Sequence, residues 1–402
     1  MAVGKSVFPE MPAIGGVRLG TAMAGIKKPD RRDLVVIEVS EGATVAATFT
    51  RNAFCAAPVH VARDHLQHTA PRYLLITTGN ANAGTGARGR QDAESCCNSL
   101  ADLAGVDAHQ VLPFSTGVIG EPLPVERIAA GLPAALESLS EAGWEMAAEG
   151  ILTTDTRIKG ASMQVELSDG TVTINGISKG SGMIQPNMAT MLGFVACDAA
   201  IDAARLQQWL RDAVRVSFNA ITVDSDTSTN DACTLIATGR GPKVESPEDE
   251  QRFRAALTTV LTDLAQAIIR DGEGATKFGT LQVEQATSVD EARAVAFTVA
   301  HSPLVKTALY ASDANWGRIL AAVGRAPVDE LDVERIVIDL GDVRLVEHGG
   351  RADGYTEEAG ARVMAQEEIV IRIQLGRGDA SATVWTSDLS HDYVSINADY
   401  RS

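Results

Sequence analysis

Short runs of β-branched residues alternate with stretches of helical periodicity along the whole chain, and this alternation limits the fold more than any other feature of the sequence. Strands are expected at 33–39, 44–50, 73–78, 280–285, 335–340 and 368–375, and helices at 91–104, 125–139, 202–217, 247–270 and 356–366. The stretch MQVELSDGTVTI predicts a hairpin, because polar and apolar residues alternate on both sides of Asp169-Gly170. The irregular order of these elements predicts a mixed α/β (α+β) protein rather than a simple doubly wound sheet.

The composition excludes several classes of protein. The 402 residues include 35 basic and 52 acidic side chains, which gives a formal net charge of −17 and argues against a nucleic-acid partner. No apolar run approaches the roughly 18 residues that span a bilayer, so no membrane partner is expected. The first twenty residues show no signal-peptide pattern, and the five cysteines form no C-x-x-C pair. We therefore expect a cytoplasmic protein.

The segment from Ile177 to Asp198, ISKGSGMIQPNMATMLGFVACD, is the most unusual part of the chain. A threonine that leads an apolar run, as Thr190 does, ordinarily packs as a β-forming residue. Alternatively, Thr190 becomes an N-terminal nucleophile if the bond from Ala189 is cut. Its freed α-amino group, with a pKa of about 7.7 to 8.0, can then accept the hydroxyl proton. The residues alone leave both interpretations open.

A nucleophile of that kind needs donors for an oxyanion, and the segment FSTGVIGEPLP offers two. They are the hydroxyl group of Thr116 and the backbone amide of Gly117, placed just before an expected helix start, where unpaired N–H groups collect. The alternative interpretation is a plain turn from a strand to a helix.

Two acidic segments raise the question of a metal site. DSDTSTND, residues 224–231, lacks the Gly and Glu of a calcium loop, since Thr229 and Leu235 stand at those positions. A loop that braces a neighbouring site is favoured over a magnesium site there. In DGEGATKF, Glu273 lies between two glycines that a helix C-terminal cap explains. The histidines show no metal-binding spacing, and no metal is predicted.

Several longer motifs occur together in one order: STGVIG, KGSGMIQPNMATMLGF, SFNAITVDSDTSTND, DGEGATKF, DANWGRILAAVGR and the terminal NADYRS. On these motifs the chain resembles the glutamate N-acetyltransferase family, also called ornithine acetyltransferase, of arginine biosynthesis. The resemblance runs from AGIKKPDRRDLVVIEV to the last residue.

The resemblance implies an αββα fold of the N-terminal-nucleophile type, shared with L-aminopeptidase D-alanine-esterase/amidase. That catalytic domain is expected over residues 1–285, with a smaller C-terminal α/β domain over 286–402. The resemblance also implies a precursor that cleaves itself between Ala189 and Thr190. The products would be an α chain of residues 1–189 and a β chain of residues 190–402, assembled as an α2β2 heterotetramer.

The implied activity is acetyl transfer from N-acetyl-L-ornithine to L-glutamate through an ester on Thr190, with Thr116 and Gly117 as oxyanion donors. The substrate-binding positions that the resemblance implies are Thr154, Lys179, Thr190, Glu273, Asn397 and Ser402. Lys179 is suited to a substrate carboxylate and Glu273 to a substrate ammonium. No resident cofactor is implied, and acetyl-CoA is an alternative acetyl donor. The other hypotheses are an amidase or aminopeptidase that uses water as the acceptor, and a non-catalytic acidic binding protein.

Overall fold

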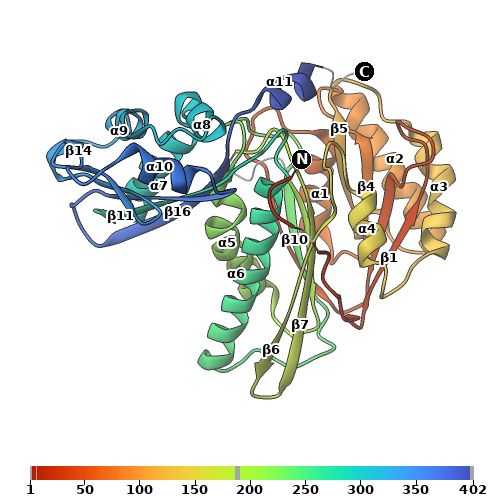
Figure 1. The fold of residues 1–402 in the computed structure, drawn as a ribbon. Coiled ribbons are helices and arrows are strands. Elements are labelled where there is room, and N and C mark those ends of the chain that lie inside the picture. The colour runs from red at the N-terminus through yellow and green to blue at the C-terminus, as the bar shows by residue number, and fades with distance from the viewer. Residues whose placement is uncertain (1, 6, 186–190, 399–402) are drawn as a thin grey trace.

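The strands of the computed structural model, which describes residues 2–5, 7–185 and 191–398, form three sheets (Figure 1). The first sheet has the order β1 (Val17–Ala22), β2 (Leu34–Val39), β4 (Tyr73–Asn80) and β5 (Val111–Val118). The second has the order β3 (Thr44–Phe49), β10 (Ala232–Ala237), β8 (Leu192–Cys197), β7 (Gly170–Lys179) and β6 (Lys159–Leu167). Both sheets mix parallel and antiparallel pairs, since β4 and β5 are parallel, as are β8 and β10.

The third sheet contains strands from the second half of the chain. Its order is β14 (Gly350–Arg351), β13 (Val343–Glu347), β12 (Val337–Leu340), β15 (Glu368–Gln374), β11 (Phe278–Ala286), β16 (Ala380–Ser387) and β9 (Ile221–Thr222). The helices of the described chain are α1 (Ala57–His68), α2 (Gly86–Ala104), α3 (Val125–Glu137), α4 (Trp144–Gly150), α5 (Ala203–Val216), α6 (Pro247–Arg270), α7 (Val289–Ala300), α8 (Pro303–Tyr310), α9 (Trp316–Gly324), α10 (Glu357–Met364) and α11 (His391–Ala398).

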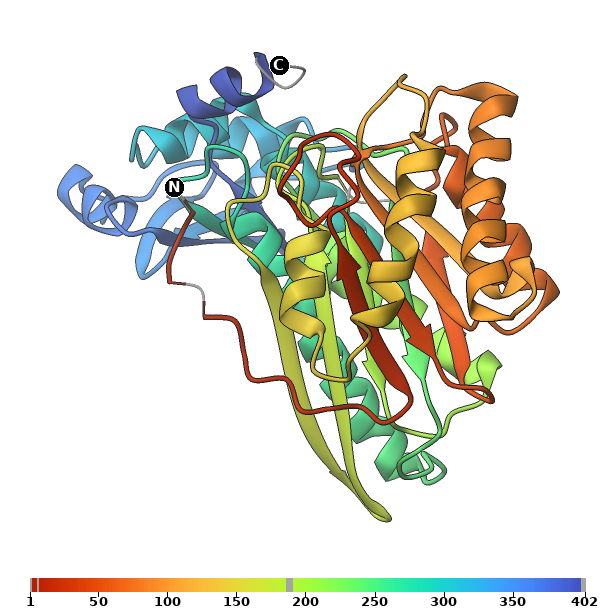
Figure 2. The same cartoon turned by 90° about the vertical axis from the view of Figure 1, so that its right-hand side faces the viewer.

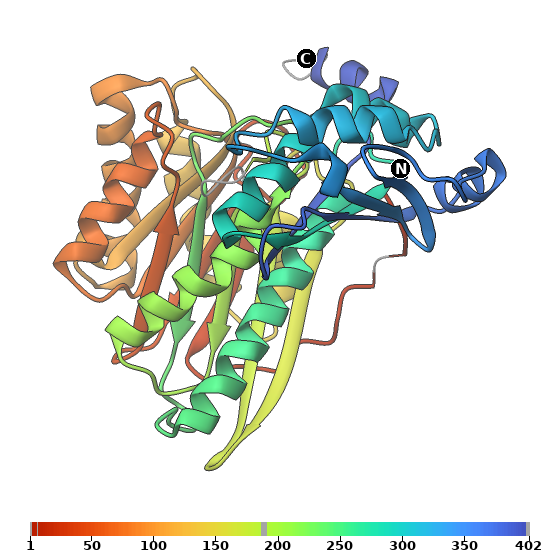
Figure 3. The ribbon, with the colours of Figure 1, turned by 90° about the vertical axis from the view of Figure 1, so that its left-hand side faces the viewer.

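The first two sheets pack face to face and carry helices on their outer faces. The core between them includes Ile76 of β4 and Ile236 of β10, and the rings of Phe114 and Phe194 meet edge to face at 5.3 Å across it. Helices α2 and α3 cover the first sheet, and α5 and α6 cover the second (Figures 2 and 3). These layers confirm the predicted αββα arrangement of a mixed α/β protein.

The two helices on the second sheet begin at residues that satisfy free backbone amides. Ser246 accepts a hydrogen bond from the amide of Asp249, and Pro247 takes the first helical position of α6. Asp202 accepts from the amide of Arg205 at the start of α5. The apolar faces of α5 and α6 then pack on the sheet, with Trp209 and Phe253 in ring contact. Strong periodicity with clear caps is why both helices were predictable.

Most of the predicted elements are present with small changes at their ends. Helix α6 has the predicted bounds, whereas α2 begins at Gly86, ahead of the predicted 91. The predicted hairpin is β6 and β7, with Gly170 at a φ of +130°. The strands expected at 33–39 and 44–50 exist but lie in different sheets, because the turn at Gly42 carries the chain from one layer to the other.

The C-terminal part packs its own core around the third sheet, with Val295 and Val299 of α7 against Leu281 of β11. The domain boundary at 285/286 stays a prediction; the third sheet also includes β9, which precedes it, and β11, which crosses it. Beyond the third sheet, α11 lies over the top of the αββα body (Figure 1). Within the described ranges, no helix combines the length and apolar character that a membrane span requires.

Candidate functional site

One cavity of about 260 Å³ lies where loops from both sheets and the end of the chain meet. The ends of β5 and β7, the loops that follow α4 and α6, and helix α11 all contribute to its wall. Every predicted site residue that the structure describes lines it: Thr116, Gly117, Thr154, Lys179, Glu273 and Asn397. The other predicted positions, Ala189, Thr190 and Ser402, lie outside the described residues. We call this cavity the central cleft.

Lys179 and Thr116 form the buried cationic side of the central cleft. The Lys179 ammonium donates to the Thr116 hydroxyl oxygen at 3.1 Å, and both residues are at least nine-tenths buried. Burial lowers the pKa of Lys179, while the charge of Asp155 acts in the opposite direction. The hydroxyl group of Thr116 therefore faces the cavity with a positive charge directly behind it.

Gly117 lies on strand β5 and not at a helix start. Sequence reasoning placed its amide just before a helix, but α3 begins at Val125, beyond a loop that follows β5. At Gly117 the φ is +134°, and a Cβ atom there would lie 2.3 Å from the carbonyl carbon of Gly79 on β4. Only glycine fits, because the two neighbouring strands approach closely at their ends. The prediction of a helix N-terminus at this position is wrong.

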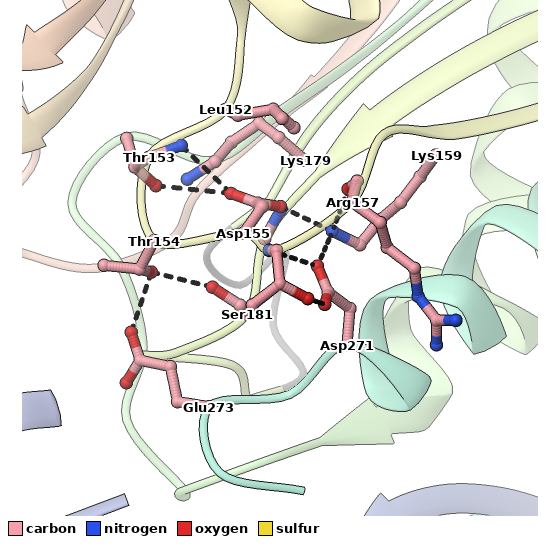
Figure 4. A network of polar contacts seen from close by, with 12 residues as sticks. Leu152, Thr153, Thr154, Asp155, Arg157, Lys159, Lys179, Ser181, Asp271 and Glu273 are labelled. Carbon is pink, nitrogen blue, oxygen red and sulfur yellow. Dashed lines mark hydrogen bonds and ion pairs between the residues drawn. The ribbon is translucent and has the colours of Figure 1, made fainter. Parts of the chain in front are cut away.

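Glu273 forms the anionic side of the central cleft. Its two carboxylate oxygens accept hydrogen bonds at 2.8 Å from the Thr154 hydroxyl and at 2.8 Å from the Asn397 side-chain amide. The Thr154 hydroxyl also contacts that of Ser181 at 2.7 Å (Figure 4). A Cβ atom on Gly182 would lie 2.3 Å from the carboxylate, so the small residue makes room for it. Residues from three distant segments thus surround one carboxylate.

A buried ionic network lies directly behind these residues. The Lys159 ammonium donates to Asp155 and to Asp271, each at 2.6 Å, with all three side chains at most 1% exposed (Figure 4). Asp155 also accepts from the amide of Gly180 at 2.7 Å, and Asp271 accepts from the amide of Thr156 at 3.0 Å. The network therefore ties together the loops that carry Thr154, Lys179 and Glu273.

Sequence reasoning missed this network. Burial alone would raise the pKa of Asp155, but the charges of Lys159 and Lys179 outweigh it and hold that pKa well below the usual range. The spacing of four between Asp155 and Lys159 was a signal for one contact. Nothing in the sequence indicates that Asp271, 112 residues further along, is the second partner.

The aspartate-rich segment 224–231 braces the cleft, as predicted. Asp224 accepts from the amides of Met183 and Ile184 at 2.6 and 2.9 Å, and Asp231 accepts from the amide of Met191 at 2.8 Å. Burial raises the pKa of Asp231 well above its usual value. Among the residues that the structure describes, no group of three His, Cys, Asp or Glu side chains could hold a metal ion.

The αββα body and its charged cleft are the arrangement expected of an enzyme of mixed α/β fold. The sequence profile of the ArgJ family matches residues 18–402. The arginine biosynthesis bifunctional protein ArgJ of Pseudomonas fluorescens (strain Pf0-1) is 57% identical over 406 residues, with all of both chains covered. The chain belongs to the ArgJ family.

Two solved structures are also similar to parts of the chain. An arginine biosynthesis bifunctional protein argJ from Bacillus halodurans is 39% identical, with a TM-score of 0.48 over 50% of this chain and 95% of that one. An ornithine acetyltransferase from Mycobacterium tuberculosis, complexed with ornithine, is 30% identical, with a TM-score of 0.41 over 44% of this chain and 95% of that one.

Replacement of Lys159 by Met should destabilise the protein by about 3–5 kcal/mol, because two buried carboxylates then lose their shared cation. The matched control is Lys243→Met, which removes an ion pair with Glu245 whose side chains are 70% and 75% exposed. The control should cost about 0–1 kcal/mol. Chemical denaturation measures both. Equal effects of the two variants would contradict the organising role of the network.

Replacement of Gly117 by Ala should reduce both stability and turnover, because the added methyl group would collide with the backbone of Gly79. Gly120→Ala is the matched control, since Gly120 also has a positive φ, +87°, but no atom lies within 4 Å of its Cβ position. The control should lose roughly 1–2 kcal/mol from the backbone conformation alone. Equal unfolding midpoints for the two variants would show that the strand contact is unimportant.

Proposed function

We propose that this protein transfers the acetyl group of N-acetyl-L-ornithine to L-glutamate, releasing L-ornithine and forming N-acetyl-L-glutamate. The observation that carries the proposal is the pairing of opposite charges in one cleft, where Lys179 and Glu273 face a cavity lined by hydroxyl and amide groups. An amino acid carries both charges, so such a cleft suits an amino-acid substrate. The related M. tuberculosis protein, described as an ornithine acetyltransferase complexed with ornithine, supports this choice of substrate.

The proposed reaction has two steps on one nucleophile. The Thr190 hydroxyl oxygen attacks the acetyl carbonyl carbon of acetyl-ornithine, the C–N bond breaks, and the threonine proton passes through the Thr190 α-amine to the leaving amine. The glutamate amine then attacks the ester carbonyl, the C–O bond breaks, and Thr190 regains its proton. In both steps the Thr116 hydroxyl and the Gly117 amide stabilise the negative oxygen.

Residues on either side of Thr190 support its role. Met183, which precedes Thr190 in the chain, lines the central cleft. Met191, which follows Thr190, donates its backbone amide to Asp231, and residues 228–230 next to Asp231 also line the cleft. We propose that the precursor cleaves itself between Ala189 and Thr190. The α and β chains would stay together, because β7 pairs with β8 and β3 pairs with β10 across that point.

The proposal also covers the oligomeric state of the protein and its possible acetyl donors. Two α and two β chains are proposed to form an α2β2 heterotetramer. No resident cofactor takes part, and acetyl-CoA is proposed as an alternative donor that loads the same threonine ester. The relative in Pseudomonas fluorescens is named as bifunctional, which agrees with a second activity.

Purified wild-type protein should consist of two fragments, residues 1–189 and 190–402, because the chain is cut before Thr190. Denaturing mass spectrometry measures their masses. Thr190→Ala should abolish both cleavage and ornithine release, because the variant lacks the hydroxyl nucleophile. Thr190→Ser is the matched control, since it keeps a hydroxyl group and should retain partial cleavage. An intact wild-type chain that is fully active would contradict the mechanism. Ornithine release that proceeds equally well without glutamate would instead identify an amidase.

The rate of ornithine release should fall at alkaline pH, with a midpoint below the ordinary lysine value, because burial lowers the pKa of Lys179 and only its charged form supports the oxyanion site. On the acid side, the rate should fall as the Thr190 α-amine gains a proton, at about pH 7.7–8.0 if its pKa is unperturbed. Lys179→Met should lower the rate and remove the alkaline limb alone. An unchanged alkaline limb in that variant would contradict this assignment.

A further inference from the structure

A second cavity of about 230 Å³ adjoins the central cleft. Gly117 and Thr154 line both cavities, so the two spaces share a wall. Lys27, Lys28 and Arg31, from the loop that joins β1 to β2, also line the second cavity. We call this second cavity the basic pocket.

The basic pocket has an excess of positive charge. Lys27 and Lys28 are exposed, and neither ammonium has an ion pair with any acid of the described chain. The Arg31 guanidinium donates to the carbonyl oxygens of Leu152 and Thr153, at 2.5 and 3.4 Å, and has no carboxylate partner within the described chain.

One acid, Asp33, also lines the basic pocket in the described part of the structure. Its two oxygens accept from the backbone amides of Ala24 and Ile26, at 2.7 and 2.6 Å. It therefore holds the loop and forms no ion pair with the lysines. Three cations against one carboxylate leave a net positive pocket in a chain whose formal charge is −17.

A glycine on strand β4 lets Lys27 lie close to the end of the first sheet. Gly79 on β4 has a φ of +109°, and a Cβ atom there would lie 2.9 Å from the Cβ of Lys27. Glycine at this position lets the lysine-bearing loop pack onto the end of the first sheet. Lys27 therefore stands next to the shared wall.

The proposed reaction sets a problem that the central cleft alone does not solve. Its donor has a cationic side chain and its acceptor an anionic one, yet both must present a nitrogen to the same carbonyl carbon. Glu273 attracts the donor's side-chain ammonium and repels the acceptor's side-chain carboxylate. Lys179 suits the α-carboxylate that both substrates carry, and it is the cation that the described residues place in the wall of the central cleft, so the acceptor's second carboxylate has no partner there.

We propose that the basic pocket binds the side-chain carboxylate of the acetyl acceptor, with Lys27 and Lys28 as its specificity-determining residues. This inference rests on the proposed function. Donor and acceptor share the wall at Gly117 and Thr154 and direct their side chains in different directions, the donor toward Glu273 and the acceptor toward the two lysines. Charge separation over two adjoining cavities thus lets one nucleophile serve two oppositely charged amino acids.

The test compares the two half-reactions in the double variant Lys27→Met/Lys28→Met, which keeps most of the apolar stems. The KM for glutamate should rise about tenfold or more, since a charge-assisted contact is lost, while the KM for acetyl-ornithine changes less than about twofold. The burst of ornithine released without acceptor should be unchanged. Glutamine, which lacks the charge, should become nearly as good an acceptor as glutamate in the variant.

Two further variants make the result specific. Lys27→Arg/Lys28→Arg should restore the low KM for glutamate, because it returns both charges. Arg240→Met/Lys243→Met removes two positive charges that line neither cavity, and it should leave both KM values unchanged.

Three outcomes would overturn the inference. They are an unchanged KM for glutamate in the Lys27/Lys28 variant, equal increases in both KM values, and a selective loss of acetyl-CoA use, which would assign the basic pocket to the phosphates of that donor. If the wild-type protein releases no ornithine from acetyl-ornithine, the proposed function itself fails, and this result is distinguishable from the other three.

Discussion

The candidate site depends on one buried cation held between two carboxylates. Lys159 lies between Asp155 and Asp271, and all three side chains are almost fully enclosed. Removing such charges from water is costly, so the arrangement is stable only because each charge has a partner and further hydrogen bonds. These contacts hold three loops from distant parts of the chain in fixed positions relative to one another. Those loops carry Thr154, Lys179 and Glu273, the charged and hydroxyl groups of the central cleft.

The surrounding fold provides the rigid frame for this network. Strand β5 of the first sheet and strand β7 of the second both end at the cleft. Asn230, just before β10 of the second sheet, links the two sheets by donating to the carbonyl oxygens of Ala81 and Ser115, at 2.6 and 2.9 Å. Helix α11 closes the cleft from above, with Tyr393 donating to Asp224 at 3.2 Å and Asn397 to Glu273. The last helix of the chain is therefore part of the site, although the preceding strand belongs to the third sheet. Accurate placement of groups from so many elements is what electrostatic stabilisation of a reacting oxygen requires.

Much of this arrangement could be predicted from the sequence, because strong local patterns decide local structure. The cap and periodicity of α6 and the Asp-Gly turn of the hairpin fixed those elements. The family resemblance carried by the ordered motifs predicted which residues would form the central cleft. Long-range pairing could not be predicted in the same way. The partnership of Lys159 with Asp271 and the position of Gly117 on a strand end arise from how the layers pack, which no local pattern records.

The most direct test of the account is to trap the acetylated protein. The purified protein would be mixed with N-acetyl-L-ornithine in the absence of an acceptor, quenched in acid, digested and mapped by mass spectrometry. We expect one acetyl group per active site, on the peptide that begins with Thr190, and loss of that group when L-glutamate is added before quenching. Release of ornithine with no acetylated peptide, or with the acetyl group on another residue, would contradict it.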